Sequence, residues 1–230
     1  MMSDQRREYQ DLERWLANNE AEDDLLAYLD ALYAHGPSTE ISAQVPSNLK
    51  KSLAQSTVYL DVLEDTPVGP IMVAVDRNGV VAIEFGRELQ DFGERLSENI
   101  SVLAQRSTSK TAEVREQLAE YFSGERTTFE LSISLEHVTD FQRKVLMATS
   151  KVRSGEVSTY GEIARRIGKS RAARAVGQAL ARNPIPILIP CHRVLGGDGS
   201  LHGYSGRGGL KTKKALLVHE GAMRLSNESI

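Results

Sequence analysis

Residues 158–194 read STYGEIARRIGKSRAARAVGQALARNPIPILIPCHRV, and this stretch decides the fold of the second half of the chain. Its first part, 158–168, predicts a short capped helix that stops at the terminal glycine, since Ser and Thr cap helices and Gly ends them. A second helix is predicted over 171–182, opened by Ser170 and ended by Asn183-Pro184, because the residue before a proline leaves the helical region. Two short helices joined by a tight glycine turn are typical of a helix-turn-helix.

The predicted second helix carries almost no bulky side chains. Small side chains let another backbone come close, and that backbone belongs either to a neighbouring helix or to a nucleic acid. Composition alone favours helix packing, whereas the surrounding arginines favour a nucleic-acid groove. The small residues are Ala172, Ala173, Ala175, Gly177, Ala179 and Ala181, and the arginines are Arg165, Arg166, Arg171, Arg174 and Arg182.

The only cysteine of the chain follows, in NPIPILIPCHRV at 183–194. A lone cysteine is most often an inert, buried apolar residue. Three prolines in this stretch predict an extended approach to Cys191 that has no place in a central β-ladder. His192 and Arg193 come directly after it, and such neighbours lower a thiol pKa. Glu220 supplies a carboxylate that can orient an imidazole, as a nucleophile, base and orienter set requires; the alternative is that it pairs with an arginine.

Composition and charge narrow the class of protein. With 230 residues, 40% hydrophobic and 26% charged, the chain can bury a core and is not mainly disordered. One cysteine excludes a disulfide framework and a cysteine-cluster zinc site. Residues 1–50 hold 10 acidic and 4 basic residues (net −6), 51–138 hold 15 and 8 (net −7), and 139–230 hold 6 and 16 (net +10). The basic second half indicates a polyanion partner, with solvated surface charge as the alternative.

The N-terminal part of the sequence predicts helices, and it contains no motif that indicates a catalytic or binding site. Apolar residues recur at helical spacing between Leu12 and Tyr33, the pattern stops at 35–38, and a short helix is expected at 47–54. The first residues are polar, so no signal peptide is predicted. The longest apolar run, 185–189, is far too short to span a bilayer. A lone cysteine fits a reducing compartment, and the expected location is the cytoplasm, with no membrane partner.

From Val58 onward the pattern changes to that of a small α+β unit. Strands are expected at 58–63, 71–75 and 80–85, with a turn-forming cluster at 66–70 and a hairpin turn at Asn78-Gly79. Helical spacing then covers 90–105 and 111–122, and an alternating strand is expected at 129–133. Asp140 is the expected cap of a helix that carries Phe141, Val145 and Leu146.

Several of these motifs together resemble one family. Pro190-Cys191-His192-Arg193-Val194, preceded by Asn183-Pro184 and Arg174–Gly177, is similar to the O6-alkylguanine-DNA alkyltransferases, also called methylated-DNA–protein-cysteine methyltransferases. Gly203-Tyr204-Ser205-Gly206 and Leu216–Gly221 resemble that family too, and the likeness covers about 58–222. It implies an α+β fold with a small α/β, ribonuclease-H-like domain at 57–136 and a mainly helical domain with the helix-turn-helix at 137–230. Residues 1–56 are then an extra N-terminal helical segment of unknown role.

The resemblance implies a single-turnover, direct-reversal repair reaction. Cys191 takes the alkyl group from O6 of guanine as a permanent thioether, and O4 of thymine is an additional candidate substrate. His192 accepts the thiol proton through a water, and Glu220 holds and polarises His192. Tyr160 gives a proton or hydrogen bond to the guanine as negative charge develops, and Asn183 braces the active-site turn. The alternative for Tyr160 is a place in the core.

The implied partner is double-stranded DNA that contains O6-alkylguanine. A base inside the duplex must be turned out of the stack before it can react. By resemblance, Arg174 fills the gap left by that base, while Ala175 and Gly177 sit in the minor groove. Tyr204 and Ser205 belong to the same DNA-binding set, with Ser205 contacting O6. A monomer without cofactor is expected, located in the cytoplasm, or in the nucleoid or nucleus when bound to DNA. One cysteine and five scattered histidines argue against the zinc that some members carry.

Two other functions compete with repair. Alkyltransferase-like proteins bind alkylated DNA without repairing it, but they lack the reactive cysteine, so Cys191 favours the enzyme. A transcription regulator would also use a helix-turn-helix, but the second helix has few side chains that read bases.

Overall fold

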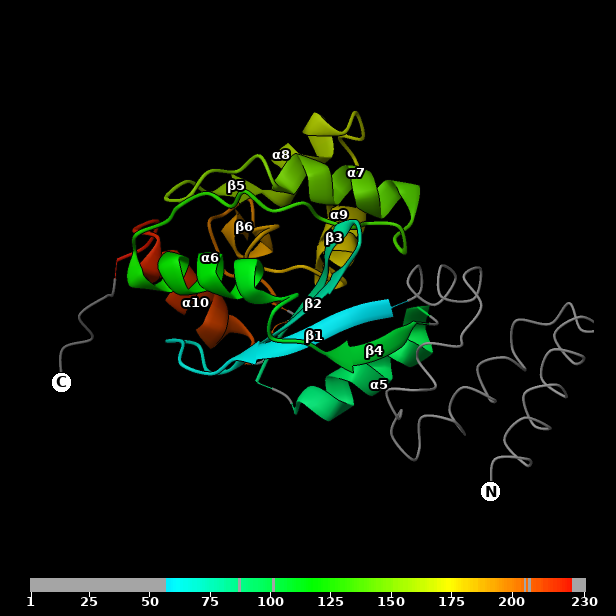
Figure 1. Cartoon of the computed structure of the whole chain (residues 1–230). Helices are drawn as coiled ribbons and strands as arrows, with labels where there is room; N and C mark the ends of the chain where they lie inside the picture. The colour runs from blue at the N-terminus through cyan, green and yellow to red at the C-terminus, as the bar shows by residue number, and fades with distance from the viewer. Residues whose placement is uncertain (1–56, 87, 101, 205, 207, 225–230) are drawn as a thin grey trace, which may run out of the picture. The chain divides into compact units, whose positions relative to one another are not determined.

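The computed structural model describes residues 57–224 except 87, 101, 205 and 207 (Figure 1). The described residues belong to one compact unit, Ser52–Ile230. The helices predicted between Leu12 and Tyr33 and at 47–54 lie outside the described residues. No helix in the described part of the chain is long and apolar enough to cross a membrane.

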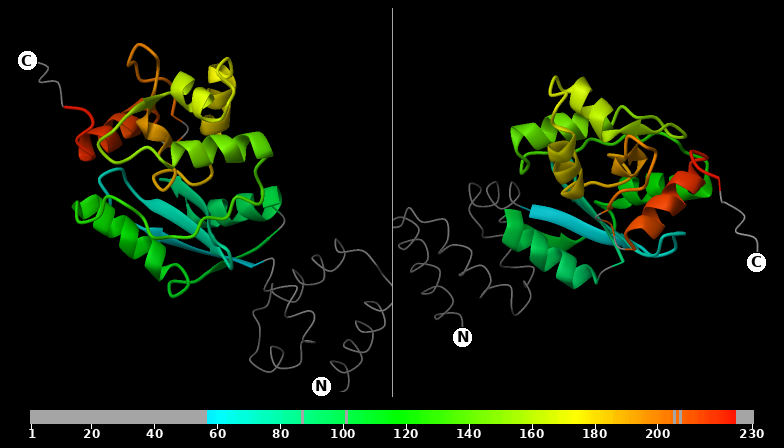
Figure 2. Two further views of the ribbon diagram at one scale, coloured as in Figure 1. Left: turned by 90° about the horizontal axis from the view of Figure 1, so that it is seen from above. Right: turned by 180° about the vertical axis from the view of Figure 1, so that it is seen from behind.

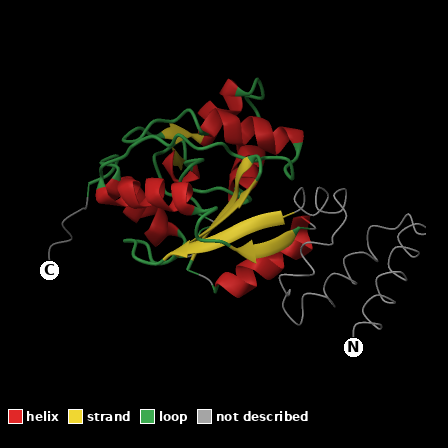
Figure 3. Ribbon diagram, in the orientation of Figure 1, coloured by secondary structure: helices red, strands yellow, loops and turns green. Residues whose placement is uncertain are grey.

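A four-stranded sheet forms the first half of the described chain. β1 (Thr57–Leu63), β2 (Ile71–Asp76) and β3 (Gly79–Phe85) are antiparallel neighbours, which confirms the three predicted strands. β4 (Leu103–Arg106) pairs with β1 in parallel, so the strand order is β3-β2-β1-β4. Figure 3 shows the sheet with the helices around it.

One helical prediction is wrong at its C-terminal end. The helix predicted over 90–105 is α5 (Leu89–Ile100), and the chain then forms β4 instead of another helical turn. The reason is tertiary: β1 offers an unpaired edge, and Thr57 pairs with Leu103 and Leu60 with Arg106 along it. Backbone pairing with a distant strand overrides a local helical pattern.

The sheet buries both of its faces, since successive side chains on a strand point to opposite sides. Met72 and Ala74 pack with Phe92 of α5 on one face. Ile71 and Val73 face the other way, into a core shared with α6 (Ala112–Ser123) and with the helices of the second half. The two halves of the chain therefore share a continuous apolar core.

The strand predicted at 129–133 is not formed. Ile133 makes a single β-bridge to Val80, supported by bonds from Val80 N to Ser132 O (2.9 Å) and from Ser134 N to Val80 O (2.8 Å). Gly79 makes this close approach possible, because a Cβ there would lie 2.2 Å from Ser132 O. The segment covers the edge of β3 without extending the sheet.

Four helices build the second half: α7 (Asp140–Thr149), α8 (Tyr160–Arg166), α9 (Ala173–Ala181) and α10 (Leu210–His219). The cap of α7 is Thr139 and not Asp140, because the Thr139 hydroxyl accepts from Gln142 N. Thr159 and Glu162 form a reciprocal capping box on α8.

α9 is shorter than predicted: it begins at Ala173 after an Ala172 cap, and Ser170 does not open it. Gly168, at φ 72°, lies in the turn between α8 and α9, which gives the predicted helix-turn-helix arrangement. Figure 2 shows α7, α8 and α9 gathered on one side of the sheet, where α9 packs against both other helices.

Candidate active site

A two-residue parallel pairing places the tyrosine and the cysteine of the predicted site next to each other. β5 (Ser158–Thr159) pairs with β6 (Val194–Leu195). Tyr160 begins α8 directly after β5, and the short 3₁₀ helix η1 (Cys191–Arg193) leads directly into β6. The pairing therefore joins two segments that lie more than thirty residues apart in the sequence.

Asn183 braces the turn that leads to η1. Its side-chain Nδ2 donates to the carbonyl of Ile189 (2.8 Å), and its Oδ1 accepts from the backbone N of Ile185 (3.0 Å). Asn183 is 9% exposed. The turn is also fixed to the sheet, since Ile83 N on β3 donates to Pro184 O (2.8 Å). Asn183 thus occupies the bracing position that was predicted for it.

The extended approach predicted for this segment is wrong. Ile187 has φ 74°, and Ile189 N donates to Ile185 O at 2.9 Å, so the chain coils back on itself before Cys191. The positive φ is unfavourable for a β-branched residue. It is compensated by complete burial of Ile187 (1% exposed) and by the two side-chain bonds of Asn183.

Cys191 is a free thiol with 5% of its surface exposed. Burial raises its pKa above the ordinary value, while a hydrogen bond from Asn183 and the charge of Lys213 lower it. The sequence predicted that neighbouring groups would lower this pKa, but the cost of desolvating a thiolate is the largest effect. The resting thiol is therefore protonated, and its activation requires a proton acceptor.

His192 follows Cys191 directly in η1 and is the candidate for that acceptor. Its ring is 0% exposed, and Nε2 lies 2.8 Å from Oε1 of Glu220. A carboxylate only accepts, so Nε2 carries the proton and Nδ1 keeps its lone pair. Nδ1 is buried and has no partner among the described residues. Burial lowers the pKa of His192, against the opposing effect of Glu220, so the ring is neutral and has a free acceptor nitrogen.

Glu220 is the centre of this network. Oε1 accepts from Tyr121 (2.7 Å), from His192 (2.8 Å) and from an Arg193 Nη (2.8 Å), and Oε2 accepts from Arg193 Nε (2.8 Å). Its side chain is 1% exposed. Burial raises the pKa of Glu220, but the bonds from His192 and Arg193 outweigh burial and lower it to about 2.

Arg193 has a different role from the expected one. Its guanidinium binds Glu220 and the carbonyl of Val152, so its charge is directed to the carboxylate and away from the thiol. The two predicted alternatives for Glu220, orienting His192 or pairing with an arginine, are both realised in one carboxylate.

Lys213 was not among the predicted site residues. It is 1% exposed, and its Nζ donates to the carbonyls of Val194 (2.7 Å) and His202 (3.2 Å) and lies 5.8 Å from the centre of the Tyr160 ring. Among the residues that the structure describes, it forms no ion pair with a carboxylate. The sequence did carry a signal, since Lys213 precedes the buried Leu216 and Leu217 by three and four residues and thus shares their face of α10.

Tyr160 is half-buried, and burial and the nearby Cys191 raise its pKa, so its hydroxyl is a proton donor at neutral pH. Gly177 of α9 packs behind this ring, because a Cβ at Gly177 would lie 3.7 Å from it. Tyr204 is packed edge-on against Phe85 (6.1 Å between ring centres), and its buried hydroxyl has no partner in the described part of the chain. Ser205 lies outside the described residues.

The helix-turn-helix presents a cationic surface. α9 buries Val176, Ala179 and Leu180. Ala175 is half-buried, while Arg174 is exposed. Small residues on this helix thus serve close packing on one face, as at Gly177, and leave the arginine side open. The exposed arginines of the motif are Arg165, Arg166, Arg171, Arg174 and Arg182.

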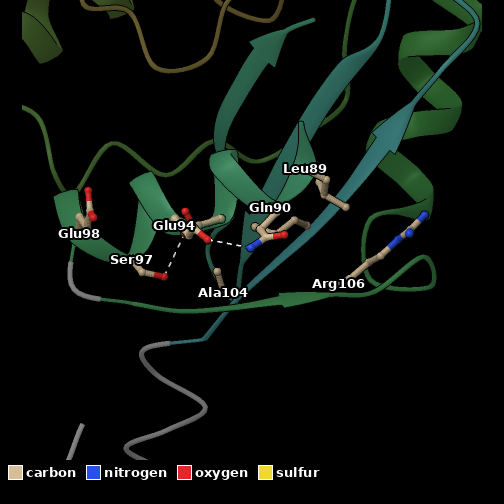
Figure 4. Close-up of a pocket in the computed structure, with 9 residues that line it drawn as sticks. Leu89, Gln90, Glu94, Ser97, Glu98, Ala104 and Arg106 are labelled. Atoms are coloured by element: carbon tan, nitrogen blue, oxygen red, sulfur yellow. Dashed lines mark hydrogen bonds between the residues drawn. The ribbon is translucent and has the colours of Figure 1, made fainter. Parts of the chain in front are cut away.

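A pocket of about 540 Å³ lies elsewhere, between α5 and the β1–β4 edge of the sheet (Figure 4). Leu60, Gly93 and Ala104 give it an apolar floor, and Glu94, Glu98 and Arg106 are among its polar lining residues. None of its lining residues is a predicted site residue. Across the described ranges, no group of three or more His, Cys, Asp or Glu side chains is arranged to hold a metal ion.

Two protein-family models match the chain. The model described as 6-O-methylguanine DNA methyltransferase, ribonuclease-like domain, matches residues 49–135, and the model for the DNA binding domain of the same family matches 140–222. A methylated-DNA–protein-cysteine methyltransferase of Methanosarcina acetivorans is 39% identical over 167 residues, which cover 72% of this chain and 99% of the relative. The constitutive enzyme of that name from Bacillus subtilis is 39% identical over 156 residues, covering 67% and 90%.

Solved structures agree with these matches. The O6-methylguanine methyltransferase of Mycobacterium tuberculosis superposes with a TM-score of 0.61 at 34% identity, covering 74% of this chain and 96% of that protein. A structure from the same organism in complex with DNA has a TM-score of 0.60 at 34% identity, covering 72% and 93%. The fold is thus that of a ribonuclease-like domain followed by a DNA-binding domain.

Proposed function

Because the chain belongs to the 6-O-methylguanine DNA methyltransferase family, we propose that it repairs DNA by moving the alkyl group from O6 of guanine to the thiol of Cys191. The observation that carries this proposal is the buried His192–Glu220 pair directly after the buried thiol of Cys191, in which the imidazole is neutral and holds one acceptor nitrogen without a partner among the described residues. This is the arrangement of nucleophile, base and orienter that activates a weak nucleophile.

The chemical step is a displacement at the alkyl carbon. His192 Nδ1 takes the thiol proton, through a water, and Glu220 stabilises the resulting imidazolium through Nε2. The sulfur of Cys191 forms a bond to the alkyl carbon while the bond from that carbon to O6 breaks, and the electron pair of the broken bond stays on the guanine. The guanine anion takes up the proton that the Tyr160 hydroxyl donates, and the proton held by His192 is passed back through water, so the products are an unmodified base and a thioether.

The leaving guanine needs its developing charge to be quenched. Tyr160 is suited to this task, because its hydroxyl is protonated at neutral pH and its segment is held beside that of Cys191 by the β5–β6 pairing. The buried charge of Lys213 stabilises the thiolate in the same site. Asn183 keeps the turn in place, and by family likeness Ser205 contacts O6.

The DNA partner is a duplex that contains the alkylated base. Exposed arginines of the helix-turn-helix supply phosphate contacts that are independent of sequence, which suits damage located anywhere in a genome. We assign Arg174 to the gap left by the extruded base, and Ala175, Gly177 and Tyr204 to the surrounding contact surface. The assigned boundaries are 57–136 for the first domain and 137–230 for the DNA-binding domain.

Nothing in the proposed step regenerates the thiol, because a thioether is a poor leaving group. The proposal is therefore a single turnover per protein molecule. O4-alkylthymine places an alkyl group on a comparable exocyclic oxygen, so it is the second substrate to test, and the protein is expected to act as a monomer.

The test is intact-mass spectrometry of the reduced protein after incubation with a duplex that contains O6-methylguanine. We expect one added CH₂ group per chain, located on Cys191 by peptide mapping, and no further gain with excess DNA. The Cys191→Ala variant is the matched control and should bind the duplex without gaining mass. A protein that binds the lesion with a reduced thiol and gains no mass is a damage binder and not a transferase.

A further inference from the structure

One residue of the ribonuclease-like domain reaches into the proton-transfer network of the other domain. Tyr121 lies on α6, and its hydroxyl donates to Oε1 of Glu220 at 2.7 Å. The neighbouring His219 donates from its ring Nε2 to the carbonyl oxygen of Tyr121, also at 2.7 Å. The last residue of α10 and its C-cap residue therefore hold the carbonyl and the hydroxyl of a single tyrosine.

The environment of Tyr121 fixes its hydroxyl in place. The residue is 1% exposed, and its ring packs against Phe122 (5.0 Å between centres), Phe129 (5.5 Å) and His219 (4.9 Å). Burial and the adjacent Glu220 both raise the pKa of Tyr121, so the hydroxyl keeps its proton and acts only as a donor to the carboxylate.

The same carboxylate oxygen serves Tyr121 and His192. Oε1 of Glu220 accepts from both of them and from Arg193. A hydrogen bond to a carboxylate stabilises its negative charge and lowers its power to stabilise a second, charged donor. The hydroxyl of Tyr121 thus moderates the support that Glu220 gives to an imidazolium at His192.

We propose that Tyr121 is a positioning residue, by which the ribonuclease-like domain sets the proton affinity of His192 in the DNA-binding domain. This inference rests on the proposed function of the site, and it gives the first domain a part in the reaction. It does not follow from either half of the sequence alone, since 99 positions separate Tyr121 from Glu220.

The ionisable groups around the network are all identified among the described residues. His192 faces the carboxylate of Glu220, and the positive charges of Arg193 and Lys213 lower the pKa of its ring. Tyr121 faces Glu220 and, at longer range, Arg193 and Tyr204, and its backbone binds His219. Tyr204 also lies near Glu220 and Cys191. A Tyr121→Phe substitution removes one neutral donor from this set and changes no formal charge.

The experiment measures the rate of Cys191 alkylation by the free base O6-benzylguanine from pH 5 to 9, in the wild type and in Tyr121→Phe. Removing the donor strengthens the bond from His192 to Glu220, so the imidazole holds its proton to higher pH. We expect the midpoint of the acid limb to rise by about 0.5–1 pH unit, the size of one lost hydrogen bond. At a pH well below that midpoint the rate then falls about three- to tenfold, while the rate at pH 8 stays within about twofold.

Two further variants of the protein test whether the effect is specific to the hydroxyl of Tyr121. Tyr59→Phe, on β1 of the same domain, removes a tyrosine hydroxyl that does not contact Glu220, and its pH profile should match the wild type. Placing 3-fluorotyrosine at position 121 makes the phenol a stronger donor, so the acid limb should move to lower pH.

NMR titration of the His192 ring reads the same effect without any reaction, and we expect a higher His192 pKa in Tyr121→Phe. If the wild type takes up no benzyl group, the proposed function fails, and the NMR titration alone still decides the role of Tyr121. An unchanged His192 titration, or a rate lowered equally at every pH, overturns the proposal and leaves Tyr121 a purely structural contact. A lowered His192 pKa overturns it too.

Discussion

The Glu220→Gln substitution gives the most direct test of the electrostatics of the site. The folded protein lowers the pKa of Glu220 from the ordinary 4.5 to about 2. One pH unit corresponds to about 1.4 kcal/mol, so the native contacts favour the ionised carboxylate by about 3 kcal/mol at neutral pH. The side chain is 1% exposed, so solvent screens this energy little.

The sign of the pH dependence follows from linkage. A carboxyl group whose pKa is lowered on folding stabilises the protein above its unfolded pKa, and this stabilisation is lost as the pH falls toward the folded value. The contribution of Glu220 is therefore about 3 kcal/mol at pH 7, still close to 3 kcal/mol at pH 4 and about 1 kcal/mol at pH 3.

The assay is urea denaturation of the wild type and Glu220→Gln at these three pH values. We expect the difference in the free energy of unfolding to shrink by about 2 kcal/mol between pH 7 and pH 3. Glu220 also raises the pKa of His192, so NMR titration of His192 in both proteins supplies its contribution, which is subtracted from the difference. Glu125→Gln, at an exposed site, is the control and should follow the wild type. A wild-type minus Glu220→Gln difference that does not change with pH refutes the reasoning, because the loss would then come from packing and not from charge.

Three other substitutions test separate parts of the structure. Lys213→Met removes the buried cation that lowers the thiol pKa, so the rate of alkylation at pH 7 should fall about tenfold and recover at higher pH. Lys211→Met, exposed on the same helix, is its control, and equal effects of the two changes would contradict the role of burial. Arg174→Ala should slow repair of duplex DNA more than alkylation by free O6-benzylguanine; equal losses in the two rate assays would exclude a role in base extrusion. Gly79→Ala should lower the free energy of unfolding by more than about 2 kcal/mol, measured by urea denaturation, because φ is 134° and the new Cβ would meet Ser132 O at 2.2 Å; a stable Gly79→Ala protein would show that the covering segment can shift.

The sequence predicted correctly those strands and helices whose propensity, turn or capping signals lie within a few residues of the element. The strands β1, β2 and β3 followed from β-branched runs and the turn at Asn78-Gly79, and α8 followed from its capping residues. The local pattern gave a wrong prediction for segments whose secondary structure depends on backbone pairing with a strand far away in the sequence. β4 forms only because β1 offers an edge, and the segment at 129–133 finds only the single bridge at Val80.

In the candidate site, too, some features could be predicted from the local sequence and others depend on tertiary contacts. Cys191 and His192 adjoin in the sequence, and their chemistry, together with the brace at Asn183, could be inferred from one motif. The direction of the thiol pKa could not, because it depends on burial, and burial is a property of the packed core.

By itself, the sequence determined which groups are available: one thiol, an adjacent imidazole, a later carboxylate and a basic helix-turn-helix. Only the tertiary structure decided how they act. It brought Glu220 to His192 across 28 positions and Tyr121 to Glu220 across 99, turned Arg193 from the thiol to the carboxylate, and buried Lys213 beside the site. The physical reason is the distance along the sequence over which each effect acts. Propensities and caps act within a few residues, whereas proton affinities depend on solvent exclusion and on contacts that exist only once the core has packed.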